Sequence, residues 1–451
     1  MRGSKRIYRF AAAAAVLAVA FGTCFPASAA SPNAGSHAGP VVINFWDMPW
    51  GTPDTQKAEK AVVANFNATH SDIQVKFTML SWGDYTQKYL SAVQANNAPD
   101  VGGGDSGIPF TMNAQSQALP INDLYAKWQK DGRFKDMPSW AYKKWEYGKK
   151  DVGITWQFDT RFIIYRKDLF RKAHVSVPKT WDQLLAAAKK LNKGGTIGIA
   201  APGKQGSYDT DQFYMTFVFQ AGGSIANKQG KAALDSPQQL KALEFEKKLV
   251  SCCAAKATPA WTFSEVEKAY DQGKAAMAFG GGWFIADLVT SASKTGSAAT
   301  LARNILKNSG VLPVLLGPGG KKAQHSVAFA NPWMIFKQTQ HPKEAKIFLD
   351  WLMSKKTLSR IYAAAPGGVW PVYKSVVKTR AFTANPLVKA VAEQETKRGV
   401  DYWYPYNKGA IGVAGLGTGI ADYIVNPVLT GARTPQDALK DAQTKLSPLF
   451  R

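Results

Sequence analysis

The sequence predicts an α/β fold built on a parallel sheet, and three observations between residues 41 and 80 support this. Residues 41–46 and 73–80 are short apolar runs rich in strand-forming side chains. Residues 54–70 between them place apolar side chains at helical spacing. A strand, a helix and a second strand within ~40 residues form a βαβ unit, whose two strands run parallel.

Residues 1–29 are expected to be a signal peptide. Four basic residues precede a short apolar run at 11–21, and Ala27-Ser28-Ala29 has the small-x-small pattern of a cleavage site. The apolar run is shorter than the ~20 residues that cross a bilayer. Cys24 follows Thr23 rather than a small residue, which disfavours a lipidated cysteine. We therefore expect an exported protein, periplasmic or extracellular and at the cell surface.

The mature chain is long and basic. Cleavage after Ala29 leaves 422 of the 451 residues, enough for two or more domains, and lowers the net charge from +24 to +20. Export argues against an intracellular nucleic-acid partner. The lysines are spread along polar helix faces, so we interpret them as a solvated basic surface suited to an anionic cell envelope or an acidic medium.

The mature chain keeps two cysteines, Cys252 and Cys253, which are adjacent. This spacing builds no metal site, and five scattered histidines do not supply one. Either a vicinal disulfide or two partly buried thiols fits the sequence. We assign these cysteines no catalytic role and expect neither a metal nor a cofactor.

A glycine cluster follows the third predicted strand. Residues 83–97 read as a helix, the strand begins at residue 99, and Gly102-Gly103-Gly104-Asp105 ends it. Ligands of open α/β sheets bind beyond the carboxyl ends of strands. A phosphate cradle is disfavoured because no GxxxxGK[ST] motif is present.

Residues 145–170 change character three times. A polar turn is followed by an extended run with Trp156, Phe158, Asp159 and Arg161, and then by an apolar strand at 162–165. Aromatic faces and charged groups together suit a polar, ring-shaped solute. The alternative is a structural strand with solvated charges, and this stretch alone does not decide between them.

The second half of the chain continues the α/β pattern. Thr180 and Gln183 have capping-box spacing for a helix at 180–191, in which Trp181 belongs to the apolar face. A strand at 275–279 precedes Gly280-Gly281-Gly282-Trp283. Since these glycines have no side chains to bury it, we expect the Trp283 ring to stack on a group other than its neighbours in sequence. An extended run at 327–336, interrupted at residues 331–333, follows. A helix is then predicted at 341–352, a further helical run continues to residue 365, and a last helix begins after the cap at residue 434.

In order and spacing, these segments resemble the extracellular solute-binding proteins of bacterial ABC importers, in the family that includes maltose-binding protein. The resemblance covers the whole mature chain. It rests on VVINFW, GDYTQKYLSAVQANNAPDV, DTRFIIYRKDLFRKAHVSVPKTWDQLLAAAKKL, YDQGKAAMAFGGGWF, GPGGKK, HPKEAKIFLDWLMS and TPQDALKDAQTKL.

The resemblance implies a two-lobed periplasmic-binding-protein fold, with two discontinuous α/β lobes joined by hinge strands and a ligand cleft between them. The implied N-terminal lobe comprises residues 30–158 and 332–378, and the C-terminal lobe residues 162–328 and 379–451. Crossings between the lobes are expected near residues 159–162 and 328–331 and around Lys378. Closure over a ligand would be a hinge motion.

The resemblance also implies which residues line the cleft. Asp159 matches an acidic residue that binds sugar hydroxyls, and Trp283 matches an aromatic on which a sugar ring stacks. Arg161 stands where maltose-binding protein has a hydrophobic residue, which leaves its role open. The expected ligand-binding set is Trp46, Trp50, Trp82, Asp105, Trp156, Asp159, Arg161, Trp283, Trp370 and Trp403.

The expected function is capture of a neutral oligosaccharide for a transmembrane permease, by a monomer that performs no chemistry. Polyamine and glycerophosphodiester ligands remain alternatives within this class. Outside it, a secreted glycosidase has a similar composition and would need two carboxyl groups ~5–10 Å apart. A polysaccharide-binding adhesin without a permease is the third alternative.

Overall fold

In the computed structural model, which describes residues 39–401 and 419–450, ten strands join in one sheet. Its main path has the order β11-β7-β10-β3-β1-β2, while β4 and β12 pair with β10, and β8 and β9 pair with β7. The strands are β1 (Val41–Asp47), β2 (Ile73–Met79), β3 (Val101–Gly103), β4 (Ala118–Leu119), β7 (Ile154–Arg166), β8 (Met277–Gly281), β9 (Ser309–Val311), β10 (Ser326–Phe336), β11 (Trp370–Pro371) and β12 (Gly399–Asp401). A separate hairpin contains β5 (Glu146–Tyr147) and β6 (Lys150–Asp151).

The predicted βαβ unit is confirmed. Strands β1 and β2 pair in parallel, and helix α1 (Pro53–Thr69) connects them. Thr52 caps this helix with its side chain, and Pro53 occupies the first turn, where a missing N–H is tolerated. Strand β3 adds to β1 in parallel, so the glycine cluster lies at the carboxyl end of a parallel strand, as expected.

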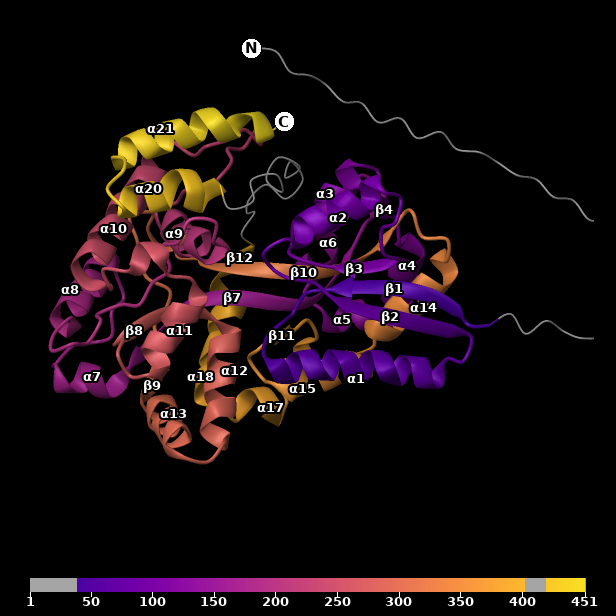
Figure 1. Ribbon diagram of the computed structural model, residues 1–451, viewed down its shortest axis with the longest axis horizontal. Coiled ribbons are helices and arrows are strands. Elements are labelled where there is room, and N and C mark those ends of the chain that lie inside the picture. Colours follow the sequence, from indigo (N-terminus) through magenta and orange to yellow (C-terminus); the bar gives the residue numbers. More distant parts are fainter. Residues whose placement is uncertain (1–38, 402–418, 451) are drawn as a thin grey trace, which may run out of the picture. The chain divides into compact units, whose positions relative to one another are not determined.

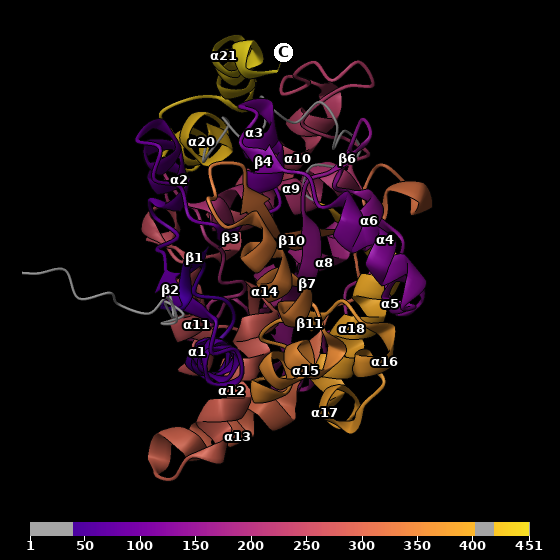
Figure 2. The ribbon, with the colours of Figure 1, turned by 90° about the vertical axis from the view of Figure 1, so that its right-hand side faces the viewer.

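Strands β7 and β10 are the longest strands of the sheet and pair in antiparallel fashion. Residues predicted as two separate extended pieces form one strand, β7, whose first half pairs with β10 and whose second half pairs with β8 and β9. Strand β10 is also continuous, and its predicted interruption is only a register shift between Asn331 and Pro332. Figure 1 shows the two strands side by side, and in Figure 2 they again lie together, between α2 and α6.

Helices cover the sheet, and the buried apolar side chains form two large clusters. One contains side chains of β1–β3, α1, α14 and α15, and the other is built around α8–α10 and α21. The remaining helices of four or more described residues are α2 (Tyr85–Gln94), α3 (Ile108–Ala114), α4 (Asn122–Lys130), α5 (Arg133–Asp136), α6 (Trp140–Lys143), α7 (Lys167–Lys172), α8 (Trp181–Leu191), α9 (Tyr208–Gln220), α10 (Pro237–Cys253), α11 (Phe263–Asp271), α12 (Gly282–Ser293), α13 (Ser297–Asn308), α14 (Pro342–Leu352), α15 (Lys355–Ala364), α16 (Lys374–Val377), α17 (Arg380–Thr383), α18 (Pro386–Arg398), η3 (Ala421–Val425), α20 (Asn426–Leu429) and α21 (Pro435–Leu446). In the part of the chain that is described, no helix is long and apolar enough to cross a membrane.

Helix α8 shows how far local sequence patterns hold. Thr180 caps it by accepting from the Gln183 N–H, and Trp181 is buried in the core, as predicted. The reciprocal half of the capping box does not form, because the Gln183 side chain accepts from the Lys179 N–H at 2.8 Å instead.

Two further expectations are decided by the fold. Cys252 and Cys253 are joined by a disulfide at the end of α10, so of the two alternatives the disulfide is present. Lys378 directly follows the short helix α16 and lies in no strand, so a crossing there would not be made by a strand.

Candidate functional site

The side chains of β7 alternate between two faces that differ in character. Gln157, Asp159 and Arg161 share one face because successive side chains of a strand point to opposite sides. Phe158 lies on the other face, and Trp156 is the extra residue at the register shift with β10, where the alternation is interrupted. We call Gln157, Asp159 and Arg161 the polar set of this strand, and Trp156 and Phe158 its aromatic set.

The aromatic set packs into the first hydrophobic cluster. Trp156 is fully buried and stacks on Trp333, with ring centroids 4.6 Å apart, while the buried ring of Trp50 meets it edge-on at 6.0 Å. The indole N–H groups of Trp50 and Trp333 both donate to Asp47, at 2.7 and 2.6 Å. Burial raises the pKa of Asp47 to about 7 despite these hydrogen bonds.

The polar set centres on an ion pair. Arg161 Nη1 lies 2.7 Å from Asp159 Oδ2, and the two side chains are 6% and 18% exposed. Arg161 Nε also donates to Gln212 Oε1 at 2.5 Å, and Nη1 to the Thr160 carbonyl at 3.2 Å. One carboxylate oxygen, Asp159 Oδ1, is buried without a hydrogen-bond partner. The pair is therefore held firmly but keeps an acceptor that a ligand can use.

Trp283 lies beside this ion pair. The Arg161 guanidinium lies 4.6 Å from the centre of the Trp283 ring, and Phe263 meets the ring edge-on at 6.2 Å. A Cβ at Gly281 would come within 1.9 Å of the indole, so only glycine lets the ring lie back over the end of β8. In the structure this ring contacts an arginine of the same chain, and the stacking of a sugar ring on Trp283 stays a prediction.

Asp105 is held by neighbours from its own region. It accepts from the Tyr85 hydroxyl and from the Gly107 N–H, each at 2.7 Å. Burial raises the pKa of Asp105. Burial and the Asp105 charge also raise the pKa of Tyr208, the first residue of α9. Trp82, at 38% exposure, packs edge-on against Tyr85 at 5.6 Å.

The other predicted tryptophans are spread around these groups. Trp46 packs against Tyr89, with ring centroids 5.7 Å apart. Trp370 is 3% exposed, and its Nε1 lies so close to Gly282 that a Cβ there would come within 2.5 Å. Trp403 lies outside the described residues.

The structure thus sorts the predicted residues into two connected groups and two outliers. Ring contacts and the Tyr85 hydrogen bond link the first group, which is Trp50, Trp82, Asp105 and Trp156. The ion pair and the cation–π contact link the second, which is Asp159, Arg161 and Trp283. Trp46 and Trp370 make neither set of contacts.

Two buried amides were missed by the sequence analysis. Gln157 and Asn331 lie directly opposite each other on β7 and β10, at 0% and 2% exposure. Both amide atoms of Gln157 and Nδ2 of Asn331 have no hydrogen-bond partner. Such atoms are rare in folded proteins and indicate a missing partner. The polar residues at every second position, Gln157, Asp159 and Arg161, were the available signal for Gln157.

Further carboxylates lie within electrostatic range of the ion pair. Burial raises the pKa of Asp209, while the Arg161 charge opposes this rise. Burial, Asp287 and Asp271 together raise the pKa of Glu267 to about 8. The Asp209 charge also raises the pKa of Glu267. Carboxyl groups therefore outnumber the single guanidinium here, although the chain as a whole is basic.

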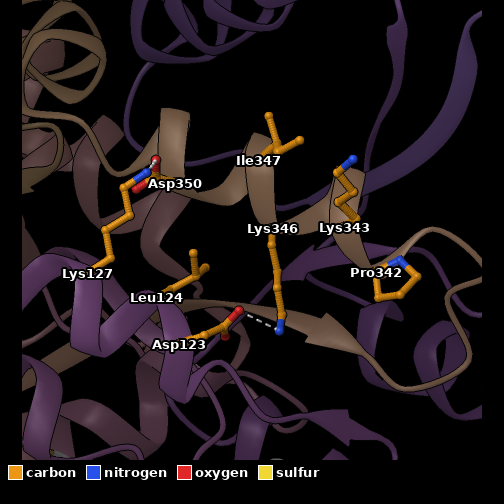
Figure 3. Close-up of a pocket in the computed structure, with 8 residues that line it drawn as sticks. All are labelled: Asp123, Leu124, Lys127, Pro342, Lys343, Lys346, Ile347 and Asp350. Atoms are coloured by element: carbon orange, nitrogen blue, oxygen red, sulfur yellow. Dashed lines mark hydrogen bonds and ion pairs between the residues drawn. The ribbon is translucent and has the colours of Figure 1, made fainter.

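A cavity of about 540 Å³ lies elsewhere, between α4 and α14. Figure 3 shows Lys346 reaching across it to Asp123, an ion pair of 2.9 Å. A second pair, Lys127 with Asp350 at 2.7 Å, also joins the two helices. None of the predicted ligand-binding residues lines this cavity.

Comparison with known families identifies the chain. A family model described as bacterial extracellular solute-binding protein matches residues 51–358, more than half of the sequence. This chain is a bacterial extracellular solute-binding protein. The match includes β7, β8 and β10, and hence the whole polar set and Trp283.

Relatives and solved structures agree with this membership. The solute-binding protein is 28% identical to YcjN of Escherichia coli (strain K12), which is named for an ABC transporter periplasmic-binding protein. The alignment covers 64% of this chain and 65% of YcjN, so the chain spans about two thirds of that relative.

The fold is shared with proteins whose structures were solved with a bound sugar. A sugar transporter protein from Arthrobacter chlorophenolicus, solved with laminaribiose, has a TM-score of 0.79 at 24% identity and covers 91% of this chain and 100% of its own. T. maritima MalE3, solved with maltose, has a TM-score of 0.76 at 19% identity, with coverage of 91% and 100%. The solute-binding protein therefore has the two-lobed periplasmic-binding-protein fold.

Proposed function

We propose that this protein is the exported substrate-binding component of an ABC importer, which captures a neutral oligosaccharide and delivers it to a transmembrane permease. Its family and the name of YcjN support the transport role. Laminaribiose and maltose in the two similar structures support a carbohydrate ligand. A binding role requires no catalytic group, and we assign none.

The observation that carries this proposal is the polar face of β7. Asp159 Oδ1, Gln157 and Asn331 offer buried acceptors and donors without protein partners. Sugar hydroxyls both donate and accept hydrogen bonds, so one ring could satisfy several of these atoms. Trp283 adds an aromatic surface beside them for ring C–H groups. We place the ligand against this face.

The charge of the site narrows the ligand class. Arg161 is paired with Asp159 at 2.7 Å, so it does not offer a free cation to a glycerophosphodiester. The neighbouring carboxyl group of Asp209 disfavours a ligand with negative charge, whereas Glu267, with its pKa raised to about 8, is mostly uncharged at pH 7. Asp209 also makes a cationic ligand, such as a polyamine, the second candidate.

Capture would proceed by closure of the two lobes, residues 30–158 with 332–378 and residues 162–328 with 379–451. Contacts to both lobes are complete only in the closed state, so ligand binding shifts the population toward it. The long antiparallel strands β7 and β10 connect the lobes in this scheme.

A thermal-shift screen tests the ligand class directly, because a ligand of the native state raises the melting temperature. The panel should contain maltose, laminaribiose, spermidine and glycerophosphocholine. We expect a rise with at least one sugar and none with glycerophosphocholine. A rise with spermidine alone would replace the carbohydrate proposal by the second candidate.

A further inference from the structure

Arg161 contacts more parts of the candidate site than any other side chain discussed above. It is 6% exposed and lies on β7, where that strand turns from β10 toward β8. Its nitrogens reach Asp159 on the same strand and Gln212 on α9. Its guanidinium also lies over two rings, Trp283 at 4.6 Å and Phe329 at 5.0 Å.

The Arg161 guanidinium makes these contacts with several N–H donors that lie in one plane. Nε donates to Gln212, and Nη1 serves both the Asp159 carboxylate and the Thr160 carbonyl. A planar cation can also stack on aromatic rings while it donates hydrogen bonds in its own plane. A lysine keeps the charge but has one nitrogen, so it cannot hold all of these partners.

We infer that Arg161 is a positioning residue of the ligand site, which holds Asp159 and Trp283 in the arrangement that meets the ligand. The expected effect of Arg161 on ligand affinity rests on the proposed carbohydrate function. The contacts of Arg161 themselves exist in the free protein. Arg161 anchors the ring of Trp283 and one oxygen of Asp159, and leaves Asp159 Oδ1 to the ligand. Anchored groups lose little freedom on binding, which raises affinity.

The same strand provides a matched control. Arg166 is also 6% exposed and also pairs with an aspartate, Asp168, at 2.6 Å. No described hydrogen bond or ion pair connects Arg166 with Asp159 or Trp283. Arg166→Met therefore removes a comparable ion pair without touching the site.

The first experiment needs no ligand. The urea midpoints of Arg161→Met, Asp159→Asn and the double variant are measured in the full chain. Arg161→Met leaves a partly buried carboxylate unpaired, so we expect the double variant to unfold at a higher urea concentration than Arg161→Met alone. For Arg161→Met and Trp283→Phe, we expect the double variant to lose less stability toward urea than the sum of the losses in the two single variants. Independent, additive losses in both comparisons would overturn the inference whatever the ligand is.

The second experiment measures affinity for maltose and laminaribiose by calorimetry. We expect Arg161→Met to weaken binding at least about tenfold, Arg161→Lys to weaken it less, and Arg166→Met to leave it unchanged. Equal losses for Arg161→Met and Arg166→Met, or no loss for Arg161→Met, would contradict a positioning role. Failure of the wild-type protein to bind either sugar counts against the carbohydrate proposal, and the urea comparisons then decide the inference.

Discussion

At the scale of single residues, some side chains of the site contact each other, and others have polar atoms without a hydrogen-bond partner. Arg161 contacts both Asp159 and Trp283, whereas Gln157 and Asn331 face each other with unpaired amide atoms. Strand alternation could predict that Gln157 joins Asp159. It could not predict Asn331, because that depends on the register between strands far apart in sequence.

Replacement of Trp283 should affect binding more than folding. Trp283→Ala removes the ring at the edge of the site and should weaken sugar binding by roughly 1–3 kcal/mol with little loss of stability. Trp181→Ala is the control, since that ring is buried in the core and should cost ~3–5 kcal/mol of unfolding free energy without changing affinity. Titration calorimetry and urea unfolding measure the two effects. Unfolding of Trp283→Ala at ordinary temperature would show that the ring belongs to the core.

Asp159→Ala should also weaken sugar binding by roughly 1–3 kcal/mol, because it removes the unpartnered acceptor Oδ1. Asp168→Ala is its control, as it removes the carboxylate of the other arginine–aspartate pair on this part of the chain. Calorimetry with the same sugar compares the two variants. Equal affinity of Asp159→Ala and the wild-type protein would exclude Asp159 from the ligand contacts.

Glu59 gives a prediction about pH. Its carboxyl group is 4% exposed and both oxygens lack partners. Burial, and then the Asp47 charge, raise its pKa well above the usual range. A group whose pKa is higher in the folded state contributes its stability below the unfolded pKa and loses it as pH rises toward the folded value.

The Glu59→Gln variant should therefore gain stability relative to the wild-type protein as pH rises from 5 to 8. Unfolding free energies measured across this range test the sign, and the exposed Glu244→Gln serves as control. A difference between Glu59→Gln and wild type that does not change with pH would contradict the assigned ionisation of Glu59.

At the scale of elements, local patterns predicted helices and strands well where one side of the element meets the core. The β1-α1-β2 unit and the capped helix α8 follow from apolar spacing and from Thr180. The continuity of β7 did not follow, because the change from mixed polar and aromatic residues to an apolar run at Phe162 was interpreted as the start of a second piece. The charges of β7 are accommodated by pairing Arg161 with Asp159, which only the packed structure reveals.

The junction of β8 and α12 offers a test at this scale. Gly281 has φ −116°, so an alanine there causes no backbone strain, but its Cβ would meet the Trp283 ring at 1.9 Å. Gly281→Ala should displace the ring and weaken sugar binding in the same direction as Trp283→Ala, by roughly 1–3 kcal/mol. Gly83→Ala is the control, since its Cβ would approach nothing closer than 3.7 Å. Unchanged affinity in Gly281→Ala would mean that the position of this ring does not matter.

At the scale of the whole molecule, the order of weak motifs along the chain predicted the family and the two-lobed fold. The α/β class needed only the first 80 residues, whereas the lobes needed the resemblance, because each is assembled from distant segments. The vicinal disulfide could not be decided from two adjacent cysteines alone. The ligand-binding residues stay a prediction: residue types mark Asp159 and Trp283, while the burial of Trp156 and the contacts of Arg161 depend on packing.

The central claim is that this protein retains a neutral oligosaccharide without transforming it. The most direct measurement is titration calorimetry with maltose, laminaribiose and longer homologues, followed by chromatography of the recovered sugar. We expect saturable binding of one sugar per chain and full recovery of the intact ligand. Release of shorter sugars would contradict it and indicate a glycosidase.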